Sequence, residues 1–216
     1  MKKYFLSALL ALNAACAPAP FTENAEAELW RPEKVAVLPY QIAVVNKNTN
    51  RAVSPLNGAV HRGGEIISGA RVAMDQILAD KLRASSSWAL LDQAEAARLL
   101  DSHARIQPIR AAALAAGRDM GADAVLIGFI YRLSQRVGQA LSVESPASAA
   151  FDLVLLRVSD GQIIWSNSFD QTQVSLSENL LEIGQYVGRG LYWFTVEEFA
   201  RYGMDEIFSR FPWPKP

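Results

Sequence analysis

The spacing of apolar residues along the chain predicts an α/β (α+β) domain in which short strands alternate with amphipathic helices. Strands are expected at 33–40, 88–91, 124–137, 149–158 and 162–174, where apolar and β-branched residues gather between turn residues. Because a short turn joins the last two strands, they form a C-terminal antiparallel hairpin. We therefore expect a single domain built on a four- or five-stranded mixed sheet with helices on both faces.

Helical periodicity and capping residues place the helices. Apolar residues recur at helical spacing within 64–85. Ser, Thr or Asp followed three residues later by Glu is the pattern of a capping box, and it opens helices at 92–103, 177–187 and 196–210. An alanine-rich helix is expected from Pro108 to about Gly121. These helices supply the layers that cover the sheet.

The turn of the C-terminal hairpin decides which side chains share a sheet face. Asp160-Gly161 is a two-residue turn signal that requires positive φ, and it places Val158 opposite Ile163. In that register Asp152 lies opposite Phe169 on an apolar face. Asp152 is then either a residue at the rim of the sheet or a buried functional carboxylate. The other face is half apolar and partly covered, and it carries Phe151, Leu153 and Leu155.

The segment 41–63 is rich in Asn, Gly and Ser and is interpreted as a long loop. Two short runs within it, 42–45 and 51–53, are candidates for a hairpin. Gly63-Gly64 lacks the Lys and the spacing of a phosphate-binding loop, so its expected role is loop flexibility and entry into the next helix. His61 falls in this polar loop and is expected to be solvated.

The first 15 residues have the layout of a secretory signal peptide. Lys2 and Lys3 give a positive start, and a short apolar stretch follows from Tyr4 to Ala15. This stretch is too short to span a bilayer, since a helix needs about 20 residues to do so. A buried first helix is the alternative, but the stretch has no polar face and an Ala-Pro repeat follows it at once.

The single cysteine, Cys16, lies where this apolar stretch ends. Small residues precede it, which resembles the lipobox of bacterial lipoproteins, in which the cysteine is diacylated and becomes the mature N-terminus. Asn13 stands where the lipobox usually has an aliphatic residue. A small-x-small site at 25–27 keeps ordinary signal cleavage open as an alternative. We expect Cys16 to be the lipidated residue.

The residue after the cysteine bears on localisation. It is Ala17 rather than Asp, and in Gram-negative lipoproteins this implies sorting to the outer membrane. The expected division of the chain is a signal peptide over 1–15, the lipidated cysteine and a flexible tether over 16–32, and a single domain over 33–216. The first expected partner is therefore the membrane, through the lipid.

Composition and charge exclude several classes of function. Half of the 216 residues are hydrophobic, which is enough for a packed core. Lys and Arg number 21 and Asp and Glu number 22, so no basic excess exists for general nucleic-acid binding. One cysteine and two histidines leave little for a metal site. No cofactor and no metal are expected.

The sequence contains none of three common catalytic signatures: GxxxxGK[ST], GxSxG or HExxH. His103 ends a helix, where a cation suits the helix dipole. An envelope hydrolase that uses Asp152 and His103 is the enzyme alternative, although no nucleophile–base pair is present in the sequence pattern. We expect that the chain is not an enzyme.

The aromatic run Tyr192-Trp193-Phe194 is the candidate partner surface. It lies between two capped helices, and Gly190 and Thr195 flank it. Aromatic residues carry much of the binding energy of protein interfaces. Core packing is the alternative, and it accounts for Phe208 in the last helix.

Five segments follow one another in an order typical of a known superfamily. They are Lys34–Pro39, the helix through Met74 to Leu82, Trp88–Asp92, Gly121–Gly128 and Ser159–Gly161. They resemble the superfamily that contains the curli-secretion channel lipoprotein, the LpoB-type activators of penicillin-binding proteins and the N-terminal domain of TolB. The resemblance covers about residues 33–175. It implies an envelope assembly or regulatory protein rather than an enzyme.

The sequence departs from the channel branch of this superfamily. Its loops at 41–63 and 135–148 are too short and polar to supply membrane-spanning strands. The resemblance therefore favours an outer-membrane-anchored, periplasm-facing lipoprotein that binds other envelope proteins. An oligomeric subunit of a curli-type secretion apparatus, without a barrel of its own, stays open as the alternative, and with it a homo-oligomer.

Overall fold

Residues 30–139, 142–174 and 193–213 are described by a computed structural model of the chain. Chain contacts divide the protein into the units Met1–Trp30 and Arg31–Pro216, and every element below belongs to the second unit. The signal peptide, Cys16, the helix expected at 177–187 and Tyr192 lie outside the described residues.

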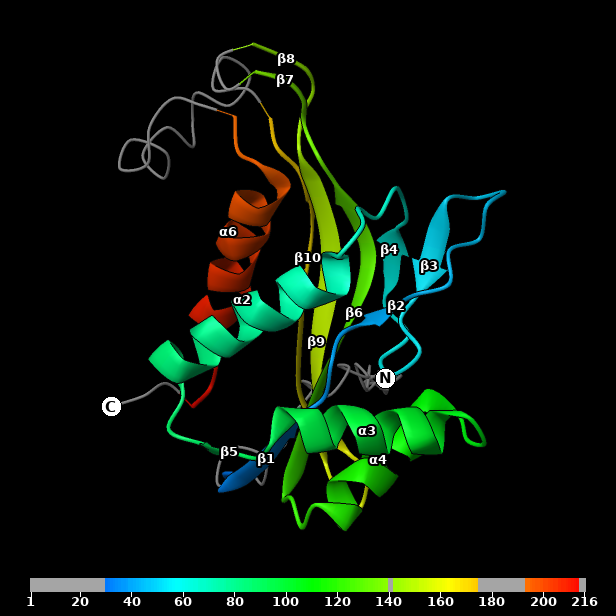
Figure 1. The fold of residues 1–216 in the computed structure, drawn as a ribbon, viewed down its shortest axis with the longest axis vertical. Helices are drawn as coiled ribbons and strands as arrows, with labels where there is room; N and C mark the ends of the chain where they lie inside the picture. The colour runs from blue at the N-terminus through cyan, green and yellow to red at the C-terminus, as the bar shows by residue number, and fades with distance from the viewer. Residues whose placement is uncertain (1–29, 140–141, 175–192, 214–216) are drawn as a thin grey trace, which may run out of the picture. The chain divides into compact units, whose positions relative to one another are not determined.

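The central sheet is mixed, as the sequence predicts, and has six strands (Figure 1). Its main path runs β10-β9-β6-β1-β5, with bounds Ile163–Thr172, Ser148–Arg157, Ala124–Ser134, Lys34–Val37 and Ala89–Leu90. β1 is parallel to both β5 and β6, whereas β9 is antiparallel to β6 and to β10. The sixth strand, β2 (Gln41–Ile42), pairs with β6 farther along the same edge that β1 uses. The C-terminal antiparallel hairpin is therefore β9–β10, and the predicted fold class is confirmed.

Two small hairpins accompany the sheet. One is formed by β3 (Arg51–Val53) and β4 (Val60–Arg62), and the other by β7 (Val137–Gln139) and β8 (Ser142–Ser145). The segment 41–63 is therefore only partly a loop. The expected pairing of 42–45 with 51–53 is wrong, because β2 hydrogen-bonds to the edge of β6 and 51–53 finds its partner in β4 instead.

Helices cover both faces of the sheet (Figure 1). On one face α2 (Ala70–Ser85) and α6 (Val196–Ser209) pack together, and Phe199 of α6 lies edge-on to Phe169 of β10 with 5.3 Å between ring centroids. On the other face lie α3 (Gln93–Ala104) and α4 (Ile109–Asp119), whose buried alanines join one core cluster with Val125 and Val154 of the sheet. Small side chains on α4 let that helix approach the strands closely.

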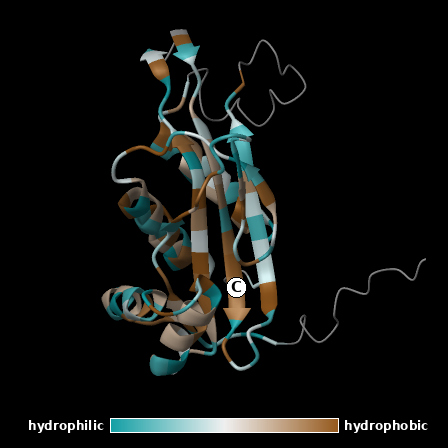
Figure 2. Cartoon of the chain, turned by 90° about the vertical axis from the view of Figure 1, so that its right-hand side faces the viewer, coloured by the Kyte–Doolittle hydropathy of each residue, from teal (hydrophilic) through white to brown (hydrophobic). Residues whose placement is uncertain are grey.

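Hydrophobic residues follow this arrangement of a sheet between two layers of helices. Figure 2 shows hydrophobic segments running along the long strands, while hydrophilic segments alternate with them on the helices. β6 and β9 are buried on both faces over almost their whole length. A strand covered on both sides is expected to be a nearly continuous apolar run, and this is why the sequence marks these two strands clearly.

The predicted helix caps are confirmed at two helices. At α3 the Asp92 carboxylate accepts a hydrogen bond from the Glu95 backbone N–H at 2.8 Å. At α6 Thr195 and Glu198 form the full reciprocal capping box. Each pair satisfies backbone donors that a helix start otherwise leaves unpaired.

α2 begins at Ala70 and not at residue 64 as the periodicity indicates. The Leu133 N–H donates to the Glu65 carbonyl, and the Ile67 N–H donates to the Leu133 carbonyl, so this stretch extends the β6 edge. Gly69 then turns the chain at φ 77° and precedes the first helical residue. Backbone groups already paired with a strand cannot enter a helix, which is the physical reason for the shorter helix.

The predicted register of the β9–β10 hairpin is wrong. Residues 158–161 form the turn, because the Arg157 N–H donates to the Gln162 carbonyl and the Gly161 N–H donates to the Arg157 carbonyl. A further irregularity follows between Ile163 and Trp165. Gly161 does adopt the expected positive φ, at 74°. The longer turn shifts the pairing by two residues, and the irregularity takes one of them back. From Trp165 onward the net shift is one residue, which exchanges the faces of β10 relative to β9.

The shift decides how the hairpin is buried. Phe169 opposes Phe151 and Asp152 opposes Ser168. On the face predicted to be half apolar, α6 covers the β9 residues completely and leaves Phe151, Leu153 and Leu155 with no exposed surface. Trp165 and Asn167 of β10, on the same face, are half-buried.

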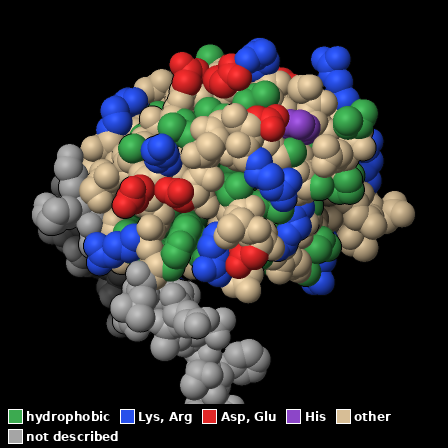
Figure 3. Space-filling view, turned by 90° about the horizontal axis from the view of Figure 1, so that it is seen from below, with side chains coloured by type: hydrophobic (Ala, Val, Ile, Leu, Met, Phe, Trp, Pro, Cys, Tyr) green, Lys and Arg blue, Asp and Glu red, His purple; other side chains and the backbone are tan. Residues whose placement is uncertain are grey.

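The surface formed by α3 and α4 is not dominated by charge of one sign. Figure 3, seen from below Figure 1, shows basic and acidic side chains interspersed among small hydrophobic areas. Among the described residues, no helix has both the length and the apolar character needed to cross a membrane.

Candidate functional site

The fully buried carboxylate of Asp152 sits in the middle of β9. It accepts a hydrogen bond from the Phe129 backbone N–H at 3.1 Å and another from the Tyr131 hydroxyl at 2.8 Å. Burial raises the pKa of the Asp152 carboxyl, and these hydrogen bonds oppose that rise. Of the two alternatives left by the sequence, the rim position is wrong and the buried position is right.

Tyr131 links this carboxylate to the β3–β4 hairpin. Burial, and then the charge of Asp152, raise the pKa of the Tyr131 hydroxyl, which therefore stays protonated and acts as a donor. The His61 ring of β4 stacks on the Tyr131 ring with 4.1 Å between centroids and 18° between planes. With no exposed surface, Asp152 cannot touch a substrate in this conformation. Its role here is to join β6 to β9 under the hairpin.

His61 is not solvated, contrary to the expectation from its loop-like sequence. Only 4% of its surface is exposed, because β4 folds over β6 and places the ring on Tyr131. Its Nδ1 lies 3.9 Å from an Asp170 oxygen, and its Nε2 has no hydrogen-bond partner among the described residues. Burial lowers the pKa of the His61 imidazole, against the opposing charges of Asp152 and Asp170, so the ring is neutral at pH 7.

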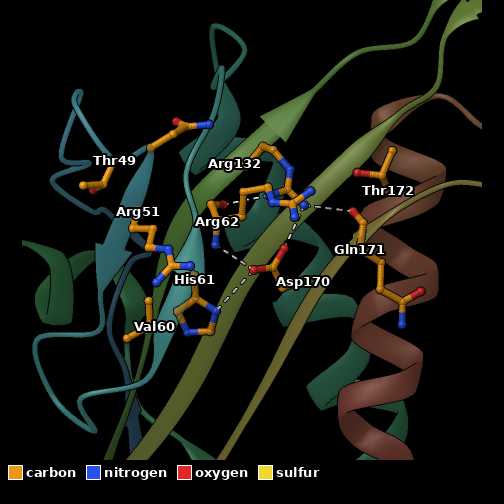
Figure 4. A pocket seen from close by; sticks show the side chains of 10 residues that line it. Thr49, Arg51, Val60, His61, Arg62, Arg132, Asp170, Gln171 and Thr172 are labelled. Atoms are coloured by element: carbon orange, nitrogen blue, oxygen red, sulfur yellow. Dashed lines mark hydrogen bonds and ion pairs between the residues drawn. The ribbon is translucent and has the colours of Figure 1, made fainter.

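A polar pocket of about 780 Å³ opens beside His61, between the β3–β4 hairpin and the end of β10. Figure 4 shows the hairpin residues on one side, Gln171 and Thr172 on the other, and Asp170 between them. Three arginines line it against one carboxylate; they are Arg51, Arg62 and Arg132. No expectation from the sequence brought these residues together.

Arg132 is the buried anchor of the pocket, with 6% of its surface exposed. Its guanidinium pairs with Asp170 at 2.8 Å and donates to the carbonyls of Arg62 at 2.7 Å and Gln171 at 3.1 Å. It thereby ties the hairpin to β10. Gly64 makes room for it, since a Cβ at that position would lie 2.6 Å from Arg132 Cδ. The sequence signal for this pocket is Arg132 itself, because an arginine within the apolar run of β6 has to be paired when it is buried.

The aromatic run is divided by the structure. Phe194 is 5% exposed, its backbone N–H donates to the Gln173 side chain at 2.9 Å, and its ring stacks with Phe199. Trp193 is half-buried, and its carbonyl accepts a hydrogen bond from Arg136. Phe194 therefore contributes to the core, and Trp193 is the described residue of the run that retains substantial exposed surface.

The other sequence candidates lie apart from one another. His103, in the last turn of α3, pairs with Asp119 of α4 at 2.8 Å between Nε2 and the carboxylate. Asp152 has its own partners within the sheet. Phe208 is in the core, as expected, and is 7% exposed. Within the described part of the chain, no group of three or more His, Cys, Asp or Glu residues is placed to hold a metal ion.

The fold is similar to several solved structures. The PelC dodecamer from Paraburkholderia phytofirmans matches at TM-score 0.46 and 16% identity, covering 84% of this chain and 89% of that one. Lipoprotein GNA1162 from Neisseria meningitidis matches at TM-score 0.42 and 13% identity, covering 73% and 97%. The LpoB C-terminal domain from Salmonella enterica matches at TM-score 0.38 and 15% identity, covering 68% and 89%.

No protein-family model and no curated protein matches the chain. An LpoB domain is among the similar structures, as the resemblance in the sequence predicts. At these identities and TM-scores, nothing about function is carried over from them.

Proposed function

We propose that this chain is an outer-membrane-anchored, periplasm-facing lipoprotein that binds other envelope proteins as an assembly or regulatory factor. The observation that carries the proposal is Cys16, a lone cysteine at the end of an apolar leader and ahead of a Pro- and Ala-rich segment. Several acyl chains at that residue would anchor the protein stably, since each buried CH₂ contributes ~0.8 kcal/mol. The tether over 16–32 would then let the domain over 33–216 reach its partners.

The arrangement of titratable groups supports a binding role over the hydrolase alternative. General acid–base catalysis needs the two groups within hydrogen-bond reach of one reacting atom. Asp152 is enclosed between β6, β9 and the hairpin, whereas His103 is paired with Asp119 on the two helices α3 and α4. Each of the two residues already has its own partner in a different part of the fold.

Tyr192-Trp193-Phe194 remains the proposed partner surface, with Trp193 as its half-buried described residue. Trp193 lies two residues before Thr195, the first residue of the capping box of α6, and Arg136 donates a hydrogen bond to the Trp193 carbonyl, which ties down the backbone that carries the indole. Phe194 fills the core beneath it. A half-buried tryptophan on a tethered backbone is the kind of residue that often contributes strongly to protein interfaces.

Replacing the cysteine tests the membrane anchor. Cys16→Ser should abolish incorporation of labelled palmitate and release the protein from the outer-membrane fraction of a sucrose gradient, because no thiol is left to acylate. Ser7→Ala, a mild change in the same leader, is the control and should change neither. Continued labelling and sedimentation of Cys16→Ser would contradict the proposed anchor.

A second experiment tests the partner surface. A photo-crosslinking amino acid at the exposed position Glu197 should give an adduct with an envelope protein in cells, and Trp193→Ala should weaken it severalfold. Trp193→Phe, which keeps an aromatic ring, is the control, and circular dichroism checks that both variants fold. An adduct unchanged in Trp193→Ala would refute this surface. An adduct with a second copy of the chain would favour the oligomeric alternative.

A further inference from the structure

Two arginines on the β3–β4 hairpin face each other without a counter-charge. The register pairs Arg51 with Arg62, and the next pair along the hairpin, Ala52 and His61, is buried. Both arginines are exposed, and neither takes part in an ion pair within the described residues. Like charges directly opposite each other on a sheet are destabilising. The hairpin therefore carries two neighbouring positive charges that no acidic side chain among the described residues neutralises.

This pair borders the polar pocket of about 780 Å³. The third arginine, Arg132, is already matched by Asp170 at 2.8 Å, and the second oxygen of Asp170 accepts the Arg62 backbone N–H at 2.8 Å. Asp170 therefore has both oxygens engaged and does not compensate the outer pair. Its two bonds, together with that of Arg132 to the Gln171 carbonyl, fix the spacing between hairpin and β10.

The remaining lining is uncharged and rich in hydrogen-bonding groups. Thr49 and Asn50 line the pocket from the turn just before β3, and Gln171 and Thr172 line it from β10 (Figure 4). The pocket volume is several times that of a free oxyanion, and it is within the range of about 300–1,000 Å³ usual for small-molecule sites. Hydroxyl and amide side chains that line the same pocket as the arginines suit a ligand that bears hydroxyl groups beside its charge.

We propose that this pocket binds a small hydroxylated anion through a carboxylate or phosphate group seated between Arg51 and Arg62. Guanidinium groups present paired donors that match the two oxygens of either group. Thr49, Asn50, Gln171 and Thr172 contact the hydroxyl groups of the ligand. An anion between the two arginines also removes their mutual repulsion, so binding stabilises the hairpin. This site is separate from the partner surface at Trp193 and does not depend on it.

Three hexoses that differ in one substituent test the proposal with the full chain. D-glucuronate supplies a carboxylate, D-glucose 6-phosphate supplies a phosphate, and D-glucose supplies neither. Calorimetric titration should show binding of at least one of the two anions, at least tenfold weaker binding of glucose, and weaker binding of the anion at high salt. Binding of one anion alone identifies the chemical source of the oxyanion.

Charge-matched variants locate the site. Arg51→Ala with Arg62→Ala should reduce the affinity for the bound anion at least tenfold, whereas Arg98→Ala with Arg118→Ala removes the same charge from α3 and α4 and should leave the affinity within twofold. Thermal denaturation checks that both double variants fold. Failure of both anions to bind, equal binding of glucose, or equal losses in the two double variants would overturn the proposal.

Discussion

Replacing Gly203 with Ala should destabilise the protein, although alanine is the better helix former. Gly203 lies in the middle of α6, on the side that faces the sheet. A Cβ at this position would lie 2.6 Å from Phe169 Cδ1, 2.7 Å from Cγ and 2.9 Å from Cε1. Real Cβ atoms do not approach an aromatic ring this closely, so either the ring or the helix must move.

The magnitude follows from two opposing contributions. Alanine in place of glycine in a helix interior gains about 0.5–1 kcal/mol. Overpacking of a well-filled core costs about 1–3 kcal/mol. The ring of Phe169 is 2% exposed and is packed by Phe151, Phe199 and Tyr202 with centroids 5.3 to 6.0 Å away, so it has no free space to enter. Overpacking is therefore expected to win, with a net loss of about 1 kcal/mol.

Urea unfolding followed by tryptophan fluorescence measures this loss, and a melting curve should show a decrease of about 2–4 °C. The double variant with Phe169→Leu provides the control, because the smaller side chain leaves room for the new methyl group. Gly203→Ala should then cost less in the Phe169→Leu background than in the natural one. A stabilised Gly203→Ala variant, or equal effects in both backgrounds, would refute the placement of α6 over Phe169 and with it the register of the β9–β10 hairpin.

Three further predictions concern single residues. As pH rises above about 4, Asp152→Asn should become more stable relative to the natural protein, because burial raises the pKa of the folded Asp152 carboxyl and ionisation of this carboxyl then opposes folding. Urea unfolding at several pH values measures the difference in unfolding free energy between the two proteins, and a difference that does not change with pH would contradict the prediction. Gly161→Val should lose about 1–3 kcal/mol, since its φ is 74° and a Cβ would lie 2.9 Å from Leu114; an unchanged melting temperature would speak against this turn. Arg132→Ala should lose about 3–5 kcal/mol in a denaturant titration, because it leaves the partly buried Asp170 without its cation; a loss below about 1 kcal/mol would mean that the hairpin is held by other contacts.

The elements of the fold could be predicted where a local pattern decides the structure. β6 and β9 are continuous apolar runs, and two sheet faces covered by helices are the usual reason for such runs. The caps at Asp92 and Thr195 depend on residues three positions apart, so they form as the sequence indicates. The same holds for the positive φ of Gly161.

The register of the hairpin and the start of α2 could not be predicted in this way. Both depend on backbone hydrogen bonds to partners chosen by the tertiary structure: residues 158–161 form a longer turn, and Glu65 to Ile67 pair with the β6 edge. A shift by one residue exchanges the two faces of a strand. Local turn signals do not contain enough information to exclude such a shift.

The sequence by itself determined the α/β class, the order of the main strands and helices, the resemblance to envelope lipoproteins and the position of the lone cysteine, because each of these follows from neighbouring residues. Only the tertiary structure decided which polar residues meet. Arg51, Arg62, Arg132 and Asp170 come from segments up to 119 positions apart and form one pocket because β4 folds against the sheet. His61 becomes buried by the same folding, which removes it from the solvent that its Asn- and Gly-rich neighbours suggest. Long-range pairing of strands sets these positions. A single sequence shows only that each strand alternates between its two faces, and this alternation does not identify which strand pairs with which.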